Sequence, residues 1–372
     1  MAKGAYIGVD NVARKIKKCY IGIDGVARKI KKAYIGIGGV ARPCWSGAGL
    51  DYYGVITPLS VARQLLKATS VENYALFGGG YGIGTHSDVV DAYDLSLTRT
   101  IPTPLSVARA YLAATSVGKC ALFGGGGGIT NAVDAYDLSL TRSTPTPLSA
   151  ARNYLAATSV GNYALFGGGY GYGTPSDVVD AYDLSLTRST QTPLSVARKD
   201  LAATSVENYA LFGGGYNGGY GIGTPSDVVD AYDLSLTRTT PTPLSVARED
   251  LAATSVGNYA LFGGGGSSST RSDVVDAYDL SLTRSTPTPL SAVRDSLAAT
   301  SVGNYALFGG GYSNVVDAYD LSLTRTKLTS LSSAKRDLAA TSVGNYALFG
   351  GGYVVTSSMS DVDVVEAYVA TI

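Results

Sequence analysis

The sequence predicts an all-β fold in which one four-stranded sheet recurs along the chain, and three observations support this prediction. First, the string ALFGGG occurs seven times, and its copies begin at Ala75, Ala121, Ala164, Ala210, Ala260, Ala306 and Ala347. Second, the string VDAYDLSLTR follows each of the first six copies. Third, apolar and polar residues alternate in short runs bounded by Gly, Asn and Pro, and no segment carries the 3.6-residue apolar stripe of a helix.

The repeat length predicts how these sheets are arranged. Successive ALFGGG strings are 46, 43, 46, 50, 46 and 41 residues apart. A period of about 40–50 residues with several short strands is typical of a β-propeller blade. Glycine, with 47 residues in a chain of 372, supplies the tight turns that many short strands need. We therefore expect a seven-bladed β-propeller over residues 51–372, with four strands in each blade.

Each repeat divides into four strands, as residues 198–240 illustrate. The innermost strand is expected in RKDLAATSV, because small side chains suit the crowded central axis. NYALFGGG is an apolar second strand that ends in glycines, which allow close backbone approach. DVVDAYDL alternates apolar and polar residues as a third strand. LTRTTPTPLS forms the outer strand, where a proline costs no ladder hydrogen bond.

The two ends of the repeat region predict how the ring closes. The last repeat is cut short, as VEAYVATI, after its third strand. The segment DYYGVITPLS, residues 51–60, precedes the first repeat and aligns with the outer-strand segment TRTIPTPLS. We expect this N-terminal strand to complete the last blade, because closure removes the exposed sheet edges that promote aggregation.

The repeats resemble those of kelch proteins. The kelch pattern combines an arginine, a small-residue strand, an apolar strand ending in a glycine doublet, and a Tyr-Asp pair. In the fourth repeat these are Arg198, Ala202–Ala203, Gly213–Gly214 and Tyr232–Asp233. The resemblance covers residues 51–372 and implies a kelch-type β-propeller. Two positions depart from the pattern, since Thr239 stands near the place of the usual Trp and Leu201 stands in that of the usual His.

Residues 1–45 carry a different, shorter repeat and a strong positive charge. They contain ten Lys and Arg residues against two Asp residues, a net charge of +8, whereas the whole chain is neutral. Three dipeptides favour two-residue hairpin turns, namely Asp10-Asn11, Asp24-Gly25 and Gly38-Gly39. We expect a small antiparallel β-meander with long strands, such as Val12–Ile23, followed by a linker at residues 46–50.

This N-terminal module is predicted to anchor the propeller or to associate with itself. The residues expected to act are a tyrosine repeated every 14 positions and two Lys-Lys pairs, namely Tyr6, Tyr20, Tyr34, Lys17, Lys18, Lys31 and Lys32. The segment AYIGVDNVARKIKK resembles short tandem repeats at the start of virion proteins in prophages of gut Firmicutes. That resemblance implies docking onto other virion proteins in a phage tail or head fibre. Nucleic-acid phosphates are a less favoured partner, because no aromatic stacking platform accompanies the lysines.

Differences among the seven repeats gather on one face of the predicted propeller. The loops between second and third strands vary, as do the two residues after each repeated arginine, whereas the SVGN and DLSLTR loops of the opposite face barely change. The varied face is rich in Tyr, Gly, Ser, Asn and Thr, a composition that serves antibody loops in binding. The residues expected to bind a ligand are Tyr81, His86, Tyr111, Tyr154, Tyr170, Tyr172, Asp200, Tyr216, Tyr220, Asp250, Arg271, Tyr312 and Tyr353.

The sequence contains no recognisable catalytic or metal-binding group. His86 is the only histidine, and the three cysteines form no CxxC pair. The repeated Asp91 and Asp94 are interpreted as forming hydrogen bonds between blades, and the repeated Arg63 as a structural partner of these carboxylates. The string GGGYNG at residues 213–218 precedes a strand and not the helix that a dinucleotide site needs. We therefore expect no cofactor, no metal and no enzymatic activity.

These observations favour a non-enzymatic recognition protein, namely a phage adhesin that binds a host-surface glycan or protein. Two alternatives stay open: an intracellular kelch scaffold for a protein partner and, less favoured, a copper-dependent sugar oxidase. The N-terminal sequence MAKGAYIGVD lacks the apolar core of a secretory signal, and no apolar run is long enough to span a membrane. We expect synthesis in the cytoplasm followed by release in virions on lysis, or else a cytoplasmic location.

Overall fold

The computed structural model describes the backbone of six strands between residues 6 and 46, and residues 49–219, 223–267, 270–355 and 359–371 in full. Every regular element in these residues is a β-strand, as the alternating sequence pattern predicted. The described part of the chain holds no helix of the length and apolar character needed to cross a bilayer.

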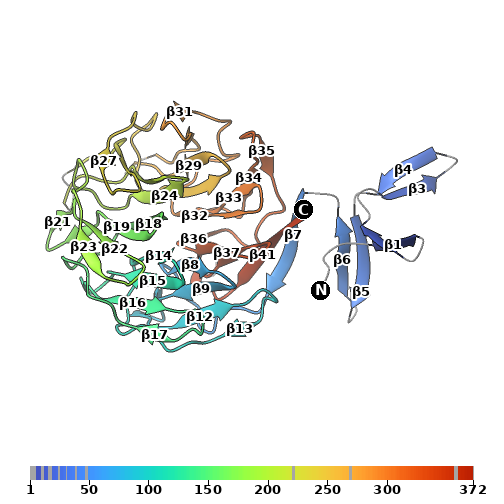
Figure 1. The fold of residues 1–372 in the computed structure, drawn as a ribbon, viewed down its shortest axis with the longest axis horizontal. Helices are drawn as coiled ribbons and strands as arrows, with labels where there is room; N and C mark the ends of the chain where they lie inside the picture. Colours follow the sequence, from blue (N-terminus) through green and yellow to red (C-terminus); the bar gives the residue numbers. More distant parts are fainter. Residues whose placement is uncertain are drawn as a thin grey trace.

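Antiparallel sheets of four strands recur through the described residues, and seven such sheets are present there (Figure 1). Each runs from an innermost to an outer strand in the order that the repeat predicted. The innermost strands are β8 (Lys67–Val71), β14 (Ala113–Val117), β18 (Ala156–Val160), β24 (Ala202–Val206), β28 (Ala252–Val256), β32 (Leu297–Val302) and β37 (Ala339–Val343). The second strands are β9 (Tyr74–Gly78), β15 (Cys120–Gly124), β19 (Tyr163–Gly167), β25 (Tyr209–Gly213), β29 (Tyr259–Gly263), β33 (Tyr305–Gly310) and β38 (Tyr346–Gly350).

The third and outer strands complete these sheets. The third strands are β12 (Val90–Tyr93), β16 (Val133–Tyr136), β22 (Val179–Tyr182), β26 (Val229–Tyr232), β30 (Val275–Tyr278), β34 (Val316–Tyr319) and β41 (Val365–Thr371). The outer strands are β13 (Arg99–Thr100), β17 (Arg142–Ser143), β23 (Arg188–Thr190), β27 (Arg238–Thr239), β31 (Arg284–Ser285), β35 (Arg325–Lys327) and β7 (Gly49–Ile56). Short additional strands in the loops are β10 (Tyr81–Gly82), β11 (Thr85–His86), β20 (Tyr170–Gly171), β21 (Thr174–Pro175), β36 (Lys335–Arg336), β39 (Tyr353–Val354) and β40 (Ser360–Asp361).

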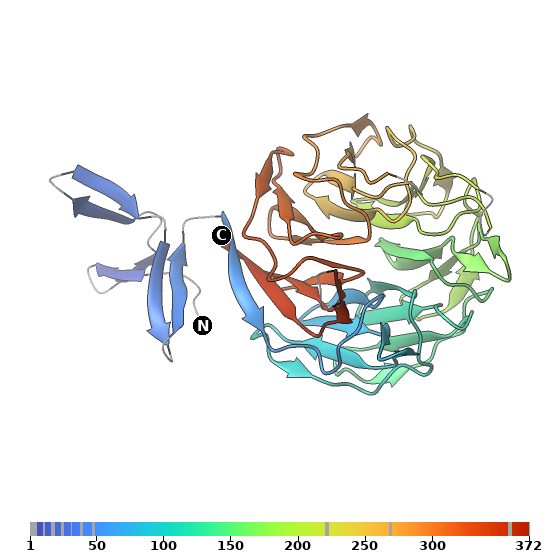
Figure 2. The same ribbon diagram turned by 180° about the vertical axis from the view of Figure 1, so that it is seen from behind.

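The four-stranded sheets are arranged around a central axis (Figures 1 and 2). Each innermost strand contacts the innermost strand of the next sheet, from β8 through β14, β18, β24, β28 and β32 to β37. Strand β37 in turn contacts β8. The small residues of the LAATSV segments line this axis, because larger side chains would not fit between strands that converge there. This arrangement fits a β-propeller-like fold.

A phenylalanine of each sheet packs on a glycine of the preceding sheet. A Cβ atom added to Gly78 would lie only 2.6 Å from the Phe123 ring, so no side chain fits there. The same contact recurs in the pairs Gly124–Phe166, Gly167–Phe212, Gly213–Phe262, Gly263–Phe308, Gly309–Phe349 and Gly350–Phe77. The first glycine of each ALFGGG string is therefore required by the neighbouring sheet.

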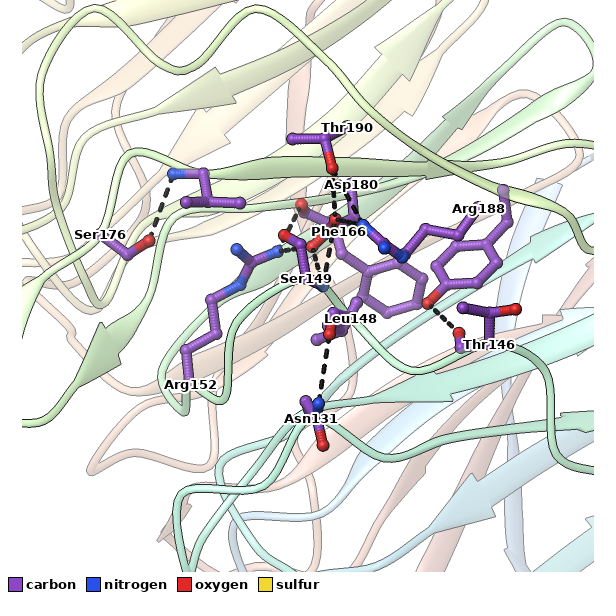
Figure 3. Close-up of polar contacts among 12 residues, drawn as sticks. Asn131, Thr146, Leu148, Ser149, Arg152, Phe166, Ser176, Asp180, Arg188 and Thr190 are labelled. Carbon is purple, nitrogen blue, oxygen red and sulfur yellow. Dashed lines mark hydrogen bonds and ion pairs between the residues drawn. The ribbon is translucent and has the colours of Figure 1, made fainter.

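A buried ion pair joins the entrance of each innermost strand to the third strand. Arg152 donates hydrogen bonds to Asp180 at 2.8 Å and to the carbonyl oxygen of Phe166 at 3.0 Å (Figure 3). Arg188 donates to the other carboxylate oxygen of Asp180 at 3.0 Å. The equivalent buried pairs are Arg63–Asp91, Arg109–Asp134, Arg198–Asp230, Arg248–Asp276, Arg294–Asp317 and Lys335–Glu366. The predicted pairing occurs within one repeat, and the same carboxylate joins neighbouring repeats as expected, because the backbone N–H of Ser149, in the outer-strand segment of the preceding repeat, donates to Asp180 at 3.3 Å (Figure 3).

The second repeated aspartate, Asp94 with its equivalents, instead forms its hydrogen bonds within its own repeat and not between blades as expected. In the third repeat, Asp183 Oδ1 accepts hydrogen bonds from the backbone N–H and the hydroxyl of Ser185, at 2.9 and 2.6 Å. These hydrogen bonds lower the pKa of Asp183 and hold the turn into the outer strand. Tyrosine also joins neighbouring repeats, since the Tyr182 hydroxyl donates to the carbonyl oxygen of Thr146 at 2.7 Å, just beyond the preceding outer strand.

The strand that precedes the first repeat pairs with the last strand of the chain. Strand β7 runs antiparallel to β41, with Ile56 opposite Val365 and Gly49 opposite Thr371. The rings of Tyr52 and Tyr368 meet edge to face, 5.3 Å between centroids. This pairing is the one expected for residues 51–60, although the strand begins at Gly49, inside the predicted linker.

The N-terminal repeats form separate hairpins and not the predicted meander. The strands are β1 (Tyr6–Val9), β2 (Val12–Lys15), β3 (Cys19–Ile23), β4 (Val26–Ile30), β5 (Lys32–Ile37) and β6 (Val40–Ser46). They pair two by two, and the expected long strand Val12–Ile23 is divided between two hairpins. Each repeat contains its own turn sequence, so the shortest loop closes within the repeat. Tyr6, Tyr20, Tyr34 and Lys32 lie on these strands, whereas Lys17, Lys18 and Lys31 lie outside the described residues.

Candidate ligand-binding site at the mouth of the central channel

One end of the central axis opens into a cavity of about 780 Å³. Its rim is built by the residues that stand two positions after each buried arginine, or after Lys335 in the seventh repeat. We call these residues the mouth ring: Leu65, Tyr111, Tyr154, Asp200, Asp250, Ser296 and Asp337. All seven line the cavity, which we call the mouth cavity.

The mouth ring has the same unusual backbone conformation in every repeat. Its φ angles lie between 52° and 57°, a left-handed region that side chains other than glycine rarely adopt. Each ring N–H donates a hydrogen bond to the carbonyl oxygen of the preceding ring residue, as Tyr154 does to Tyr111 at 3.0 Å. The last of these bonds runs from Leu65 to Asp337 at 2.8 Å, so the seven bonds form a cycle. Backbone hydrogen bonding thus holds a conformation that local sequence disfavours.

Aromatic side chains form one sector of the mouth cavity. The rings of Tyr111 and Tyr154 lie 4.3 Å apart between centroids and are tilted by 39°. Tyr81 and His86, on the facing strands β10 and β11, meet edge to face at 5.8 Å. The Lys199 ammonium lies 5.3 Å from the centroid of the Tyr154 ring. Such a sector presents flat apolar faces beside a cationic group.

Carboxylates form the opposite sector. Asp200 pairs with Lys199 at 3.0 Å, and Arg336 donates to Asp337. Burial raises the pKa of Asp200, although Lys199 opposes the shift. Asp250 is exposed to the open cavity; partial desolvation by its surroundings raises its pKa well above the ordinary value, and the nearby carboxylates raise it further.

Lys67 is a functional candidate that the sequence analysis missed. It begins strand β8 and lines both the mouth cavity and a narrower cavity of about 190 Å³ that continues along the axis. The other side chains described around that narrow cavity are alanine and leucine. Lys67 is exposed to the open cavity, and partial desolvation by the converging strands lowers its pKa, while the carboxylates of the mouth ring partly offset this shift. The signal was present in the sequence, because LKATSV in the first repeat replaces LAATSV in the other six.

The structure gathers about half of the predicted binding residues at this cavity. Those that line it are Tyr81, His86, Tyr111, Tyr154, Asp200, Asp250 and Tyr312. Arg271 lies against the Tyr312 ring, 3.8 Å from its centroid, and Tyr353 lies near Arg336. Lys199 also covers the Tyr216 ring.

Two of the predicted binding residues do not line the mouth cavity, and a third lies outside the residues that the structure describes. Tyr170 is 6% exposed, and the centroid of its ring lies 5.6 Å from the Lys199 ammonium. Tyr172 is 83% exposed and lines a different hollow, of about 830 Å³, between the loops of the second and third repeats. Tyr220 lies outside the described residues. The loop residues therefore do not act as one surface, and the mouth ring rather than the loop tips carries most of the cavity.

No cluster of three His, Cys, Asp or Glu side chains suited to a metal ion occurs among the residues that the structure describes. His86 has an aromatic neighbour, Tyr81, on the paired strand.

Comparison with known proteins supports the fold. No protein-family model and no curated protein matches this chain. The solved structure of YjhT is similar, with a TM-score of 0.56 and 13% sequence identity over 71% of this chain and 96% of that chain. At this identity the likeness concerns the fold alone, and it agrees with a kelch-like β-propeller. The likeness of residues 1–45 to phage repeats stays a prediction.

Proposed function

We propose that the repeat region is a closed, seven-bladed kelch-type propeller whose mouth cavity binds a saccharide of a host bacterial surface without catalysing a reaction. Three cyclic features support closure: the hydrogen bonds of the mouth ring, the Gly–Phe contacts, and the pairing of β7 with β41. Each of them connects the first repeat, or the strand that precedes it, to the last repeat.

The chemistry of the mouth cavity supports a saccharide. Its volume lies within the range of about 300–1,000 Å³ usual for small-ligand pockets. Tyr111 and Tyr154 offer flat apolar faces, on which the C–H faces of a sugar ring pack. Asp200 and Asp337 offer carboxylate oxygens that accept hydrogen bonds from hydroxyl groups. A flat protein surface fits such a concave site less well.

One observation carries the proposal. The seven mouth-ring positions share one backbone conformation and one hydrogen-bond pattern, yet they hold Leu, Tyr, Asp and Ser. We call the seven four-stranded sheets that support these positions the frame. The frame repeats the same Ala, Phe, Gly and Asp residues almost unchanged. A uniform frame that displays varied side chains into one cavity is the arrangement of a recognition site.

We further propose that the N-terminal hairpins attach the propeller to a phage tail or head fibre. The support is their sequence resemblance and their net charge of +8 over residues 1–45. Two-stranded hairpins are marginally stable alone, so packing on virion proteins would stabilise them. The protein would then be made in the cytoplasm and released in virions by lysis.

An array of bacterial surface saccharides tests the proposed binding. Tyr111→Ser and Tyr154→Ser remove the aromatic sector, and the chain itself carries Ser296 at the equivalent position, so these variants keep the ring geometry. We expect the parent protein to bind one or more saccharides and both variants to lose binding. Tyr172→Ser, away from the cavity, is the control and should bind as the parent does. Absence of parental binding, or equal binding by all variants, would refute the proposal.

A further inference from the structure

Most charged side chains at the mouth cavity are paired with each other. Asp200 pairs with Lys199, Asp337 with Arg336, and Asp295 with Arg271 at 3.1 Å. Because each pair is neutral, none of these groups leaves a charge for a ligand to balance.

Lys67 and Asp250 are the exceptions in the described part of the chain. Neither side chain makes an ion pair or hydrogen bond with another described residue, although both line the mouth cavity. They have opposite charges and form no ion pair with each other, although the Asp250 carboxylate is near enough to raise the pKa of Lys67. Both side chains are exposed to the open cavity and are unpaired, so each offers its charge to a ligand that enters the cavity.

The position of Lys67 argues against a role in the frame. The equivalent residues in the other repeats are Ala113, Ala156, Ala202, Ala252, Ala298 and Ala339. The frame therefore needs only a methyl group at this place. The lysine adds an ammonium group at the point where the wide cavity meets the narrow one.

We propose that the mouth cavity binds a zwitterionic ligand, whose acidic group pairs with Lys67 and whose ammonium group pairs with Asp250. This inference rests on the proposed function and narrows the ligand to a saccharide that carries both charges. A ligand with only an acidic group would leave Asp250 unpaired and would face the mouth carboxylates. A ligand with only an amino group would leave Lys67 unpaired in the same way.

Titrations followed by NMR with five small probes test this inference. Muramic acid is a zwitterionic sugar, glucosamine a cationic one, glucuronic acid an anionic one and glucose a neutral one. 4-Aminobutyrate carries both charges without a sugar ring. We expect muramic acid to bind at least tenfold more tightly than the three other sugars.

Two variants test whether Lys67 and Asp250 pair with the charged groups of the ligand, and the other repeats provide matched controls. Lys67→Ala restores the residue of the other six repeats, and Asp250→Asn keeps a side chain that tolerates the left-handed backbone. Each should weaken muramic acid binding at least tenfold, and should weaken it much more than it weakens glucose binding. Adding Ala113→Lys to Lys67→Ala moves the ammonium to the neighbouring repeat and should not restore binding.

The outcomes separate this inference from the proposed function. Equal affinity for muramic acid and glucose, or unchanged muramic acid binding by Lys67→Ala, overturns the zwitterion inference and leaves saccharide binding intact. If 4-aminobutyrate binds more tightly than every sugar, the result supports pairing of Lys67 and Asp250 with ligand charges. It contradicts the proposal that the ligand is a saccharide. Failure of every probe to bind contradicts both.

Discussion

The backbone N–H of Leu65 donates a hydrogen bond of 2.8 Å to the carbonyl oxygen of Asp337, which joins the first repeat of the chain to the seventh. This bond completes the cycle that supports the mouth ring. The side chains around the mouth cavity are therefore positioned by contacts between residues that are distant in sequence. Predictions about the ring, the frame and the ligand follow from this dependence.

Gly350→Ala should destabilise the fold by about 1–3 kcal/mol, the usual effect of overpacking a core. The new Cβ would lie 2.8 Å from the Phe77 ring of the first repeat. Urea unfolding measures the loss. Phe77→Leu alone should also destabilise, but the double variant should recover part of the loss, because the smaller side chain makes room. Strictly additive losses would show that the two residues are not in contact.

Asp180→Ala should destabilise the fold by about 3–5 kcal/mol, because it leaves the Arg152 charge buried without a partner. The same unfolding measurement applies. Asp183→Ala is the control within the same repeat, since this exposed residue only holds a turn, and its loss should be clearly smaller. Equal losses would contradict the structural role that we assign to the buried pair.

Alkaline pH should weaken the pairing of β7 with β41. Burial, together with the Glu366 carboxylate, raises the pKa of Tyr52 from 10.0 to about 12. The folded state thus favours the neutral phenol, and this contribution to stability is complete below pH 10 and is lost as the pH rises towards 12. The Tyr52→Phe variant lacks the ionisable phenol, so its free energy of unfolding should fall less steeply over this pH range. Parallel stability curves for the two proteins would count against the prediction.

Asp250→Asn should increase stability at neutral pH. The raised pKa of Asp250 means that its ionisation disfavours the folded state, so stability declines as the pH rises above the ordinary value of 3.8. The advantage of the variant in thermal unfolding should be present at pH 7 and vanish below pH 3.8. A variant that is less stable than the parent at pH 7 would show that the carboxylate belongs to the frame and not to a ligand site.

The frame was predictable from sequence because its residues recur. The ALFGGG string gave the second strands, and the recurrence of Arg63 and Asp91 indicated a structural pair. The partner of each glycine, a phenylalanine one repeat away, was not predictable, because the contact joins residues about 45 positions apart and leaves no local signal. The different roles of Asp91 and Asp94 also required coordinates, since Asp91 accepts hydrogen bonds from Arg63 and from Ser60 of the preceding outer-strand segment, whereas Asp94 holds a turn.

The candidate site was predictable only in part. Sequence differences placed Tyr111, Tyr154 and Asp250 on one face, which carries the mouth cavity, but nothing local indicates their left-handed backbone, which depends on the hydrogen-bonded cycle. Lys67 was overlooked because it interrupts a strand that was interpreted as frame, although its departure from six alanines was visible. Tyr172 was grouped with the site on composition alone, whereas its ring lies over a separate hollow.

Hydrogen–deuterium exchange with the best-binding array saccharide tests the central claim, that the mouth cavity is the recognition site. The claim predicts slower exchange in peptides that contain Leu65, Tyr111 and Tyr154, because a ligand restrains the ring amides. Peptides that cover the turn at Asp94 should be unchanged. Protection at that turn, with none at the mouth ring, would contradict the account.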